Sequence, residues 1–179
     1  MKENISVIFQ NLSGKITGFA GEADRGMIDS AVAAGERVFM DCDEDAFIIR
    51  KEGEALALSS LQEKDIPGAG MMPVIAMEPD GQIMMFAFAN SEALRLTLQN
   101  RYGYYYSRSR DKLWKKGESS GHDQIIHDIL IDCDADAVLL KVEQKGGACH
   151  TGYRSCFYRT IDGKVVGEKL FEPEDVYKT

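Results

Sequence analysis

Two short acidic motifs, ninety-one positions apart, constrain the fold of this chain most strongly. Residues 41–46 read DCDEDA, and residues 132–137 read DCDADA. Apolar segments flank each motif: RVFM and FIIR around the first, ILI and VLLK around the second. Short apolar runs rich in branched and aromatic residues predict buried β-strands. The sequence therefore predicts two pairs of buried strand segments, each pair joined through an acidic cluster.

The rest of the chain predicts an α+β fold built mostly of antiparallel strands. Residues 79–81, Pro-Asp-Gly, separate two apolar runs and predict a hairpin turn. Residues 91–101 predict the one main helix, with Asn90 as its N-cap and Gly103 as its terminator. The next segment, YYYSRSR, predicts an aromatic strand with a basic end, and GGACHTGYRSCFYR predicts a glycine-rich loop before a last strand.

A change in composition predicts a domain boundary before the hairpin. Residues 62–73, QEKDIPGAGMMP, gather charged residues with two Pro and two Gly. We therefore expect a small α/β extension in residues 1–70, followed by a larger domain in residues 71–179.

The extension carries its own secondary-structure signals. Residues 25–35 predict a short helix, capped at Asp29 or Ser30 and ended by Gly35. Gly53, inside KEGEALAL, predicts a hairpin turn that returns the chain. The role of the extension stays open, and structural cover, a dimer interface and effector binding are all compatible with its composition.

Charge and hydropathy exclude two classes of protein. The net charge of −8 lacks the basic footprint of a nucleic-acid binder. The longest apolar run, IMMFAFA at residues 83–89, is too short to span a bilayer, and the N-terminus has no apolar stretch of the secretory type. We therefore expect a cytoplasmic protein with neither a nucleic-acid partner nor a membrane partner.

A basic island nevertheless lies between Arg101 and Lys116, where six Lys or Arg residues face a single acid, Asp111. Alternating Ser and Arg offer hydroxyl and guanidinium donors, and a guanidinium can grip a phosphate with two hydrogen bonds. The candidate substrate-binding residues are Ser107, Arg108, Ser109, Arg110, Trp114, Lys115 and Lys116. The alternatives are a solvated basic face for the whole run and a core position for the tryptophan.

Three of the four cysteines cluster near the C-terminal end, at Cys133, Cys149 and Cys156. In a reducing compartment such residues are thiols or metal ligands more often than disulfides. Their spacings of 16 and 7 match no CxxC zinc pattern, but three thiolates with one open position suit a catalytic zinc site. His150 could close the shell or act as an acid/base at the open position. Burial as small apolar side chains is the alternative.

The carboxylates around Cys133 suggest a second metal. In an extended strand Asp132, Asp134 and Asp136 would share one face, with Cys133 on the other. Three carboxylates on one face repel one another unless a hard cation such as Mg²⁺ lies between them. The pattern predicts a magnesium site in front of the strand and a zinc site behind it, although many acidic loops have a similar sequence.

Three long segments, taken in order, identify a family. YYYSRSRDKLWKKGESSGH, IDCDADA and GACHTGYRSCFYR resemble phosphoribosyl-AMP cyclohydrolase, the ring-opening hydrolase of histidine biosynthesis. MMPVIAMEPDGQIMMFAFANSEALRLTL resembles the opening segment of that family. The resemblance covers roughly residues 72–160. The 20 residues after Arg159 are too few for the helical pyrophosphohydrolase domain that follows in some members, so we expect the cyclohydrolase activity alone.

The resemblance implies a homodimeric enzyme that uses zinc and magnesium. The ligands it implies are Cys133, Cys149 and Cys156 for zinc and Asp132, Asp134 and Asp136 for magnesium. It implies that Cys133 reaches a zinc site completed by the partner subunit, and that His150 carries a proton. The implied substrate is an adenine nucleotide with a second phosphoribosyl group on N1, which hydrolysis opens at the C6–N1 bond. Two phosphates on one substrate would account for the basic island.

Two rival functions remain compatible with the sequence. One is a non-catalytic zinc module in which His150 supplies the fourth ligand. The other is a related zinc hydrolase that acts on a different nucleotide.

The earlier motif cannot build the same site from its own surroundings. Positions sixteen and twenty-three after Cys42 hold Leu58 and Asp65, whereas those after Cys133 hold cysteines. We therefore interpret DCDADA as the site and DCDEDA as an echo, left by chance or by an old partial duplication. A narrower alternative is that DCDEDA mimics or blocks the contribution of a partner subunit.

Overall fold

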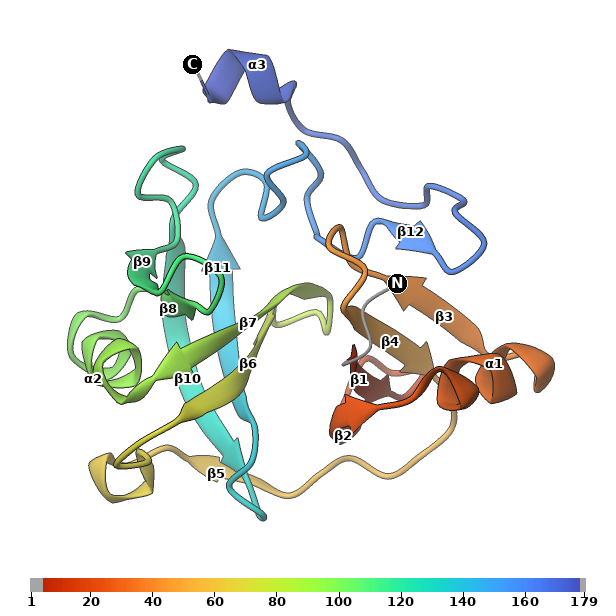
Figure 1. The fold of residues 1–179 in the computed structure, drawn as a ribbon, viewed down its shortest axis with the longest axis horizontal. Helices are drawn as coiled ribbons and strands as arrows, with labels where there is room; N and C mark the ends of the chain where they lie inside the picture. Colours follow the sequence, from red (N-terminus) through yellow and green to blue (C-terminus); the bar gives the residue numbers. More distant parts are fainter. Residues whose placement is uncertain (1–4, 178–179) are drawn as a thin grey trace.

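The computed structural model describes residues 5–177 and confirms the predicted α+β class, with mostly antiparallel sheets and few helices (Figure 1). The first sheet contains β1 (Ile5–Gln10), β2 (Ile16–Ala23), β3 (Arg37–Met40), β4 (Ala46–Arg50) and β12 (Arg159–Thr160). The second sheet contains β5 (Leu58–Ser60), β6 (Met71–Met77), β7 (Ile83–Asn90), β10 (Gln124–Asp132) and β11 (Val138–Gln144). A separate two-stranded ribbon pairs β8 (Tyr104–Ser107) with β9 (Lys112–Lys115).

The helices are short, and the two that follow β2 and β7 lie at the outer sides of the sheets (Figure 1). They are α1 (Arg25–Ala33), α2 (Ser91–Asn100), α3 (Pro173–Val176) and the 3-10 turn η1 (Glu63–Asp65). Within residues 5–177, no helix is long and apolar enough to cross a membrane.

The two sheets exchange edge strands. The strand order is β12-β3-β4-β1-β2 in the first sheet and β5-β10-β11-β6-β7 in the second. β5 follows β4 along the chain but pairs with β10, and β12 follows β11 but pairs with β3. Each sheet is therefore closed at one edge by a segment that follows the other sheet. The predicted division at residue 70 stays a prediction, with β5 on its N-terminal side and in the second sheet.

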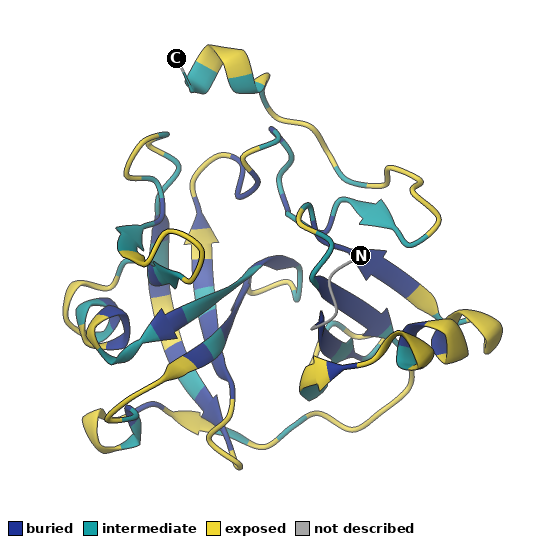
Figure 2. Cartoon of the chain, viewed as in Figure 1, coloured by how far each residue is buried: buried dark blue, intermediate teal, exposed yellow. Residues whose placement is uncertain are grey.

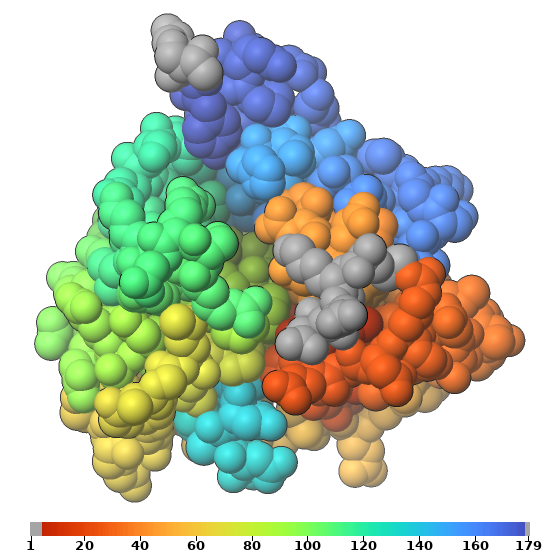
Figure 3. All heavy atoms as spheres, in the orientation of Figure 1, coloured from red at the N-terminus to blue at the C-terminus, as the bar shows by residue number. Residues whose placement is uncertain are grey.

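Apolar side chains from both sheets meet in a shared cluster, which we call the central core. Its buried members are Ile8, Ile16, Phe39, Ala46, Ile48, Ile75, Met77, Ile83, Leu139 and Phe157. Each sheet also buries a cluster of its own on another face. In Figure 2 the inner strands of both sheets are largely buried, and most exposed residues lie on helices and loops. Packing on this scale joins the two sheets into one body (Figure 3).

Several local predictions are confirmed. The two strands around residues 79–81 form the β6–β7 hairpin, and the acidic motifs lie between β3 and β4 and between β10 and β11. The helix α2 begins after Asn90, whose side-chain oxygen accepts a hydrogen bond from the Ala93 amide at 2.9 Å. Gly35, with a φ of 76°, follows the end of α1 as expected.

Three helix and turn assignments were wrong. The helix α1 begins at Arg25, within the predicted range, but its N-cap is Asp24 and not Asp29 or Ser30: the Asp24 carboxylate accepts from the Met27 amide at 3.1 Å. Arg101, with a φ of 57°, takes the left-handed position that ends α2, before Gly103 is reached. Gly53 starts no hairpin, because residues 51–57 form no strand and β5 pairs with the other sheet.

Candidate metal and active site

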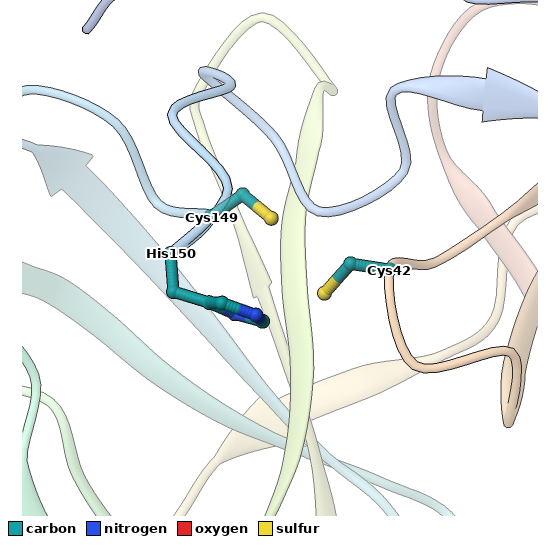
Figure 4. Close-up of side chains that lie close together, drawn as sticks. All are labelled: Cys42, Cys149 and His150. Carbon is teal, nitrogen blue, oxygen red and sulfur yellow. The ribbon is translucent and has the colours of Figure 1, made fainter. Parts of the chain in front are cut away.

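Three potential metal ligands from distant parts of the sequence lie together. The ligand atoms of Cys42, Cys149 and His150 are all within 4.8 Å of one another. Figure 4 shows the two cysteine side chains and the imidazole directed towards a common point. Cys42 belongs to the acidic turn after β3, whereas Cys149 and His150 belong to the loop after β11. The site is thus assembled from two segments that lie far apart in the sequence.

Cys156 joins this group through its sulfur. The pKa of Cys149 is lowered to about 2, because the thiols of Cys156 and Cys42 donate hydrogen bonds to its sulfur. The same hydrogen bonds raise the pKa of both donors. The Thr151 hydroxyl lies 2.9 Å from the Cys149 sulfur and adds a further partner. These neighbours favour the thiolate form of Cys149, which is the form of cysteine that binds metals.

The loop that carries Cys149 is shaped by tight turns. The Gly152 amide donates to the Cys149 carbonyl at 3.1 Å, and the Cys149 amide donates to the Tyr153 carbonyl at 3.1 Å. Gly152 has a φ of 94°, and a side chain there would come within 2.1 Å of the Phe171 carbonyl oxygen. Only glycine fits this position, so the sequence CHTG sets the turn that presents Cys149 and the exposed His150.

Cys42 is held by its own turn and by the C-terminal segment. One oxygen of the buried Asp41 carboxylate accepts from the Asp45 and Ala46 amides at 3.1 and 3.2 Å. The Arg159 guanidinium donates to the Asp41 and Cys42 carbonyls at 3.3 and 3.4 Å. The same group pairs with the Glu44 carboxylate at 3.1 Å. Arg159, three residues after Cys156, therefore clamps the Cys42 turn beside the other two sulfurs.

The structure corrects the prediction of an extended strand at residues 132–136. β10 ends at Asp132, and the chain then turns, with Ala135 at a φ of 56°. One oxygen of the buried Asp132 carboxylate accepts from the Asp136 and Ala137 amides at 3.0 and 3.3 Å. Asp134 and Asp136 are exposed, so the three carboxylates do not share one strand face. A hydrogen bond with Asp132 raises the pKa of Asp136 to about 6.

Cys133, the first of the predicted zinc ligands, is exposed, and its sulfur lies 3.5 Å from a carboxylate oxygen of Asp134. Among residues 5–177 the group of ligand atoms contains Cys42 and does not contain Cys133. The structure therefore gives DCDEDA a place in the candidate site, which its interpretation as an echo did not. Its near identity to DCDADA was the available signal, but spacing within the chain does not indicate which sheets face each other.

The first part of the basic island forms an exposed turn after β8. The Arg110 amide donates to the Ser107 hydroxyl at 3.3 Å, and the Ser107 and Ser109 hydroxyls lie 3.4 Å apart. The Arg108 guanidinium lies 3.7 Å above the centre of the Phe88 ring. The side chains of residues 108–110 are exposed, which leaves their donors accessible to a ligand.

The second part of the island is more enclosed. Trp114 packs against Tyr105, with ring centres 5.1 Å apart, beside the core of the second sheet. The Lys115 ammonium is 3.3 Å from the Asp123 carboxylate. Lys116 is buried, which lowers its pKa, while the charges of Cys156 and Cys149 act in the opposite direction. Lys116 thus lies near Cys149 and Cys156.

Comparison with known proteins gives the same family as the motifs. The family model described as phosphoribosyl-AMP cyclohydrolase matches residues 85–158. A relative of that name from Methanothrix thermoacetophila is 59% identical over 64% of this chain and 95% of its own length. Another from Methanococcoides burtonii is 61% identical over 62% of this chain and 92% of its own length. The chain belongs to the phosphoribosyl-AMP cyclohydrolase family.

Only some of the cysteines lie inside the family match. Cys133, Cys149, His150 and Cys156 lie inside the matched residues 85–158, and Cys42 lies outside them. A third relative, from Methanosarcina mazei, is 64% identical over 54% of this chain and 80% of its own length. The cyclohydrolase match therefore accounts for the loop after β11, and the first sheet adds a cysteine that the match does not include.

Proposed function

We propose that this chain is a zinc-dependent phosphoribosyl-AMP cyclohydrolase, which hydrolyses the C6–N1 bond of the adenine ring in 1-(5-phosphoribosyl)-AMP. The observation that carries the proposal is the group of Cys42, Cys149 and the exposed His150, with Cys156 beside the other two sulfurs, inside a chain of this family. Our proposal assigns the chain to the third step of histidine biosynthesis.

The donor set fits zinc. Thiolate and imidazole are the ligands zinc prefers, and a catalytic zinc site keeps one position open. Cys42, Cys149 and Cys156 would hold the metal, and the imidazole of His150 would lie at or beside the fourth position. When bound, zinc supplies Lewis acidity that lowers the pKa of a water molecule towards neutrality.

The protein's own groups would handle the proton and the leaving nitrogen. Water oxygen adds to C6, the C6–N1 bond breaks, and N1 takes up a proton while the exocyclic nitrogen stays on C6 as a carboxamide. The exposed imidazole of His150 can accept the proton from water and deliver it to N1. A second phosphoribosyl group on N1 leaves the ring electron-poor, so C6 is the favoured position of attack.

The substrate's two phosphates require separate cationic partners. The exposed turn of residues 107–110 offers hydroxyl and guanidinium donors to one of them. The buried Lys116 lies near Cys149 and Cys156, so it and the adjacent Lys115 suit the phosphate nearer the reacting ring. Trp114 contributes by packing under this segment.

We keep Asp132, Asp134 and Asp136 as the proposed magnesium ligands, although fewer of their oxygens are available than the sequence predicted. Asp134 and Asp136 have exposed carboxylates, while one oxygen of Asp132 is already used by the turn. A cation there would use the remaining oxygens of these three residues. Measurement of activity against magnesium concentration in Asp134→Asn tests this assignment, and an unchanged response would contradict it.

The experiment that tests the function combines metal content with turnover. We expect one zinc per chain and a change in absorbance as the purified protein opens the ring of phosphoribosyl-AMP. His150→Gln, a neutral replacement of similar size, should retain the fold and lose most of the rate. One zinc per chain without turnover of this substrate would favour the zinc module over the enzyme.

A further inference from the structure

The two sheets are built to one plan. We call residues 5–50 the N-terminal repeat and residues 71–144 the C-terminal repeat. The strands β2-β1-β4-β3 of the first correspond in order to β7-β6-β11-β10 of the second. In both, the middle pair is parallel and the outer pairs are antiparallel. A helix follows the hairpin in each repeat, and the exchanged strands β12 and β5 occupy corresponding edges.

The correspondence extends to single residues. Ile8 lies opposite Phe19 and Ile48, and Ile75 lies opposite Phe86 and Leu139. These sets differ by a shift of sixty-seven positions in the hairpin and ninety-one in the following strands. The hairpins also share one irregularity, between Phe9 and Gln10 in the first and between Ala76 and Met77 in the second. Chance similarity of two short motifs does not produce a common register across four strands.

The acidic turns are copies of each other in three dimensions. Glu44 and Ala135, at the same position in each motif, both have left-handed backbone, with φ of 59° and 56°. Asp41 and Asp132 each accept two backbone amides from the residues four and five positions later. The repeats therefore share the local geometry that presents a cysteine at the second position of the motif.

The repeats contact each other through equivalent residues. The rings of Phe19 and Phe86 stack with centres 5.9 Å apart and an angle of 26°. The hairpin glycines Gly14 and Gly81 touch along their backbones. Contact between corresponding residues is the signature of a two-fold related pair, here formed inside one chain.

The repeats differ in what surrounds their turns. The C-terminal repeat inserts the β8–β9 ribbon with the basic island, and it is followed by the loop that carries Cys149 and Cys156. The N-terminal repeat passes directly from α1 to β3, and the positions corresponding in number to the two cysteines hold Leu58 and Asp65. Of the two symmetry-related positions, only the one at Cys42 is therefore surrounded by further thiols.

We propose that the N-terminal repeat is a degenerate second copy of the cyclohydrolase core, which completes the metal site of its own chain through Cys42. The chain is then an internal dimer with one working site, active as a monomer, and Cys133 is the unused equivalent of Cys42. The Arg159 clamp orients the supplying turn. This rests on the proposed function for the identity of the metal and replaces the expectation of a zinc site shared between two subunits.

The test compares Cys42→Ser with Cys133→Ser, two identical changes at equivalent positions. Bound zinc is measured in the full-length proteins by competition with a chromogenic chelator, and molecular mass is measured by light scattering. We expect a monomer of 19.9 kDa with one zinc for the unmodified chain. Cys133→Ser should bind zinc unchanged, and Cys42→Ser should bind it at least about 100-fold more weakly, since one thiolate's share of the binding free energy is lost.

Loss of zinc in Cys133→Ser, or unchanged zinc in Cys42→Ser, would overturn the proposal, as would a stable dimer whose zinc content depends on Cys133. Circular dichroism of the metal-free proteins controls for folding, and Cys42→His should restore part of the affinity if the position is a ligand. These measurements use no substrate. A protein with the expected zinc pattern and no turnover would contradict the proposed function alone, and an active protein that needs Cys133 would contradict this inference alone.

Discussion

The DCDEDA and DCDADA turns have the same backbone and different surroundings. Both begin with a buried aspartate that caps the turn, and both place a cysteine next to it. Cys42 faces two other thiols and a histidine under the Arg159 clamp, whereas Cys133 is exposed beside Asp134. In Figure 3 the orange residues of the first turn lie against the blue segment that carries the other cysteines. Local sequence defines such a turn, and the neighbouring segment decides whether its cysteine can bind a metal.

The largest effect is expected in the loop that carries Cys149. The turn of Cys42 faces this loop, and the turn of Cys133 does not. Cys149→Ser removes the sulfur to which both other thiols donate, so zinc and activity should be lost together, with the rate reduced by at least about 1,000-fold. Zinc content and turnover are measured on the same sample. A variant that stays active and metal-loaded would contradict the site. Thr151→Val, which removes only a hydroxyl next to this sulfur, is the control and should lower zinc affinity by about 10-fold.

The next comparison concerns the central core, where the repeats meet. Ile8 and Ile75 occupy equivalent, fully buried positions in this cluster. Replacing either by Ala should lower the free energy of unfolding by about 2–5 kcal/mol, because each change leaves a cavity in the same interface. Chemical denaturation provides the measurement. If Ile8→Ala has little effect while Ile75→Ala is strongly destabilising, the N-terminal repeat is not an equal partner in the fold.

The capping aspartates separate stability from metal binding. Asp41→Ala and Asp132→Ala each leave two backbone amides without their acceptor and should cost about 1–3 kcal/mol of stability. Only Asp41→Ala should also weaken zinc binding, since its turn carries Cys42. Equal loss of zinc affinity in both variants would mean that the two turns do not differ in function.

The smallest effect probes the two-fold contact itself. Phe19 and Phe86 stack across the repeats, and a double-mutant cycle to Leu should give a coupling energy of about 0.5–1.5 kcal/mol. The pair of Phe86 with Phe88, an edge-to-face contact within one strand, serves as the reference. A coupling of zero between Phe19 and Phe86 would argue against a packed interface between the repeats.

Local signals in the sequence were sufficient for most strands and for the family. Short apolar runs and the Pro-Asp-Gly turn predicted β6, β7, β10 and β11, because strand and hairpin preferences act over a few residues. The residue that ends α2 was missed, because Arg101, which is not a glycine, takes the left-handed position. Long ordered motifs within residues 85–158 were enough to identify the cyclohydrolase family.

Only the tertiary structure decided the membership of the site. Sequence spacing placed Cys133 with Cys149 and Cys156, since all three lie close along the chain. The fold instead brings Cys42 to Cys149, because the two sheets pack face to face and β12 ties the C-terminal segment to β3. The sequence by itself determined two cysteine-bearing turns of one design. Which of them meets the other thiols depends on long-range packing that no local pattern records.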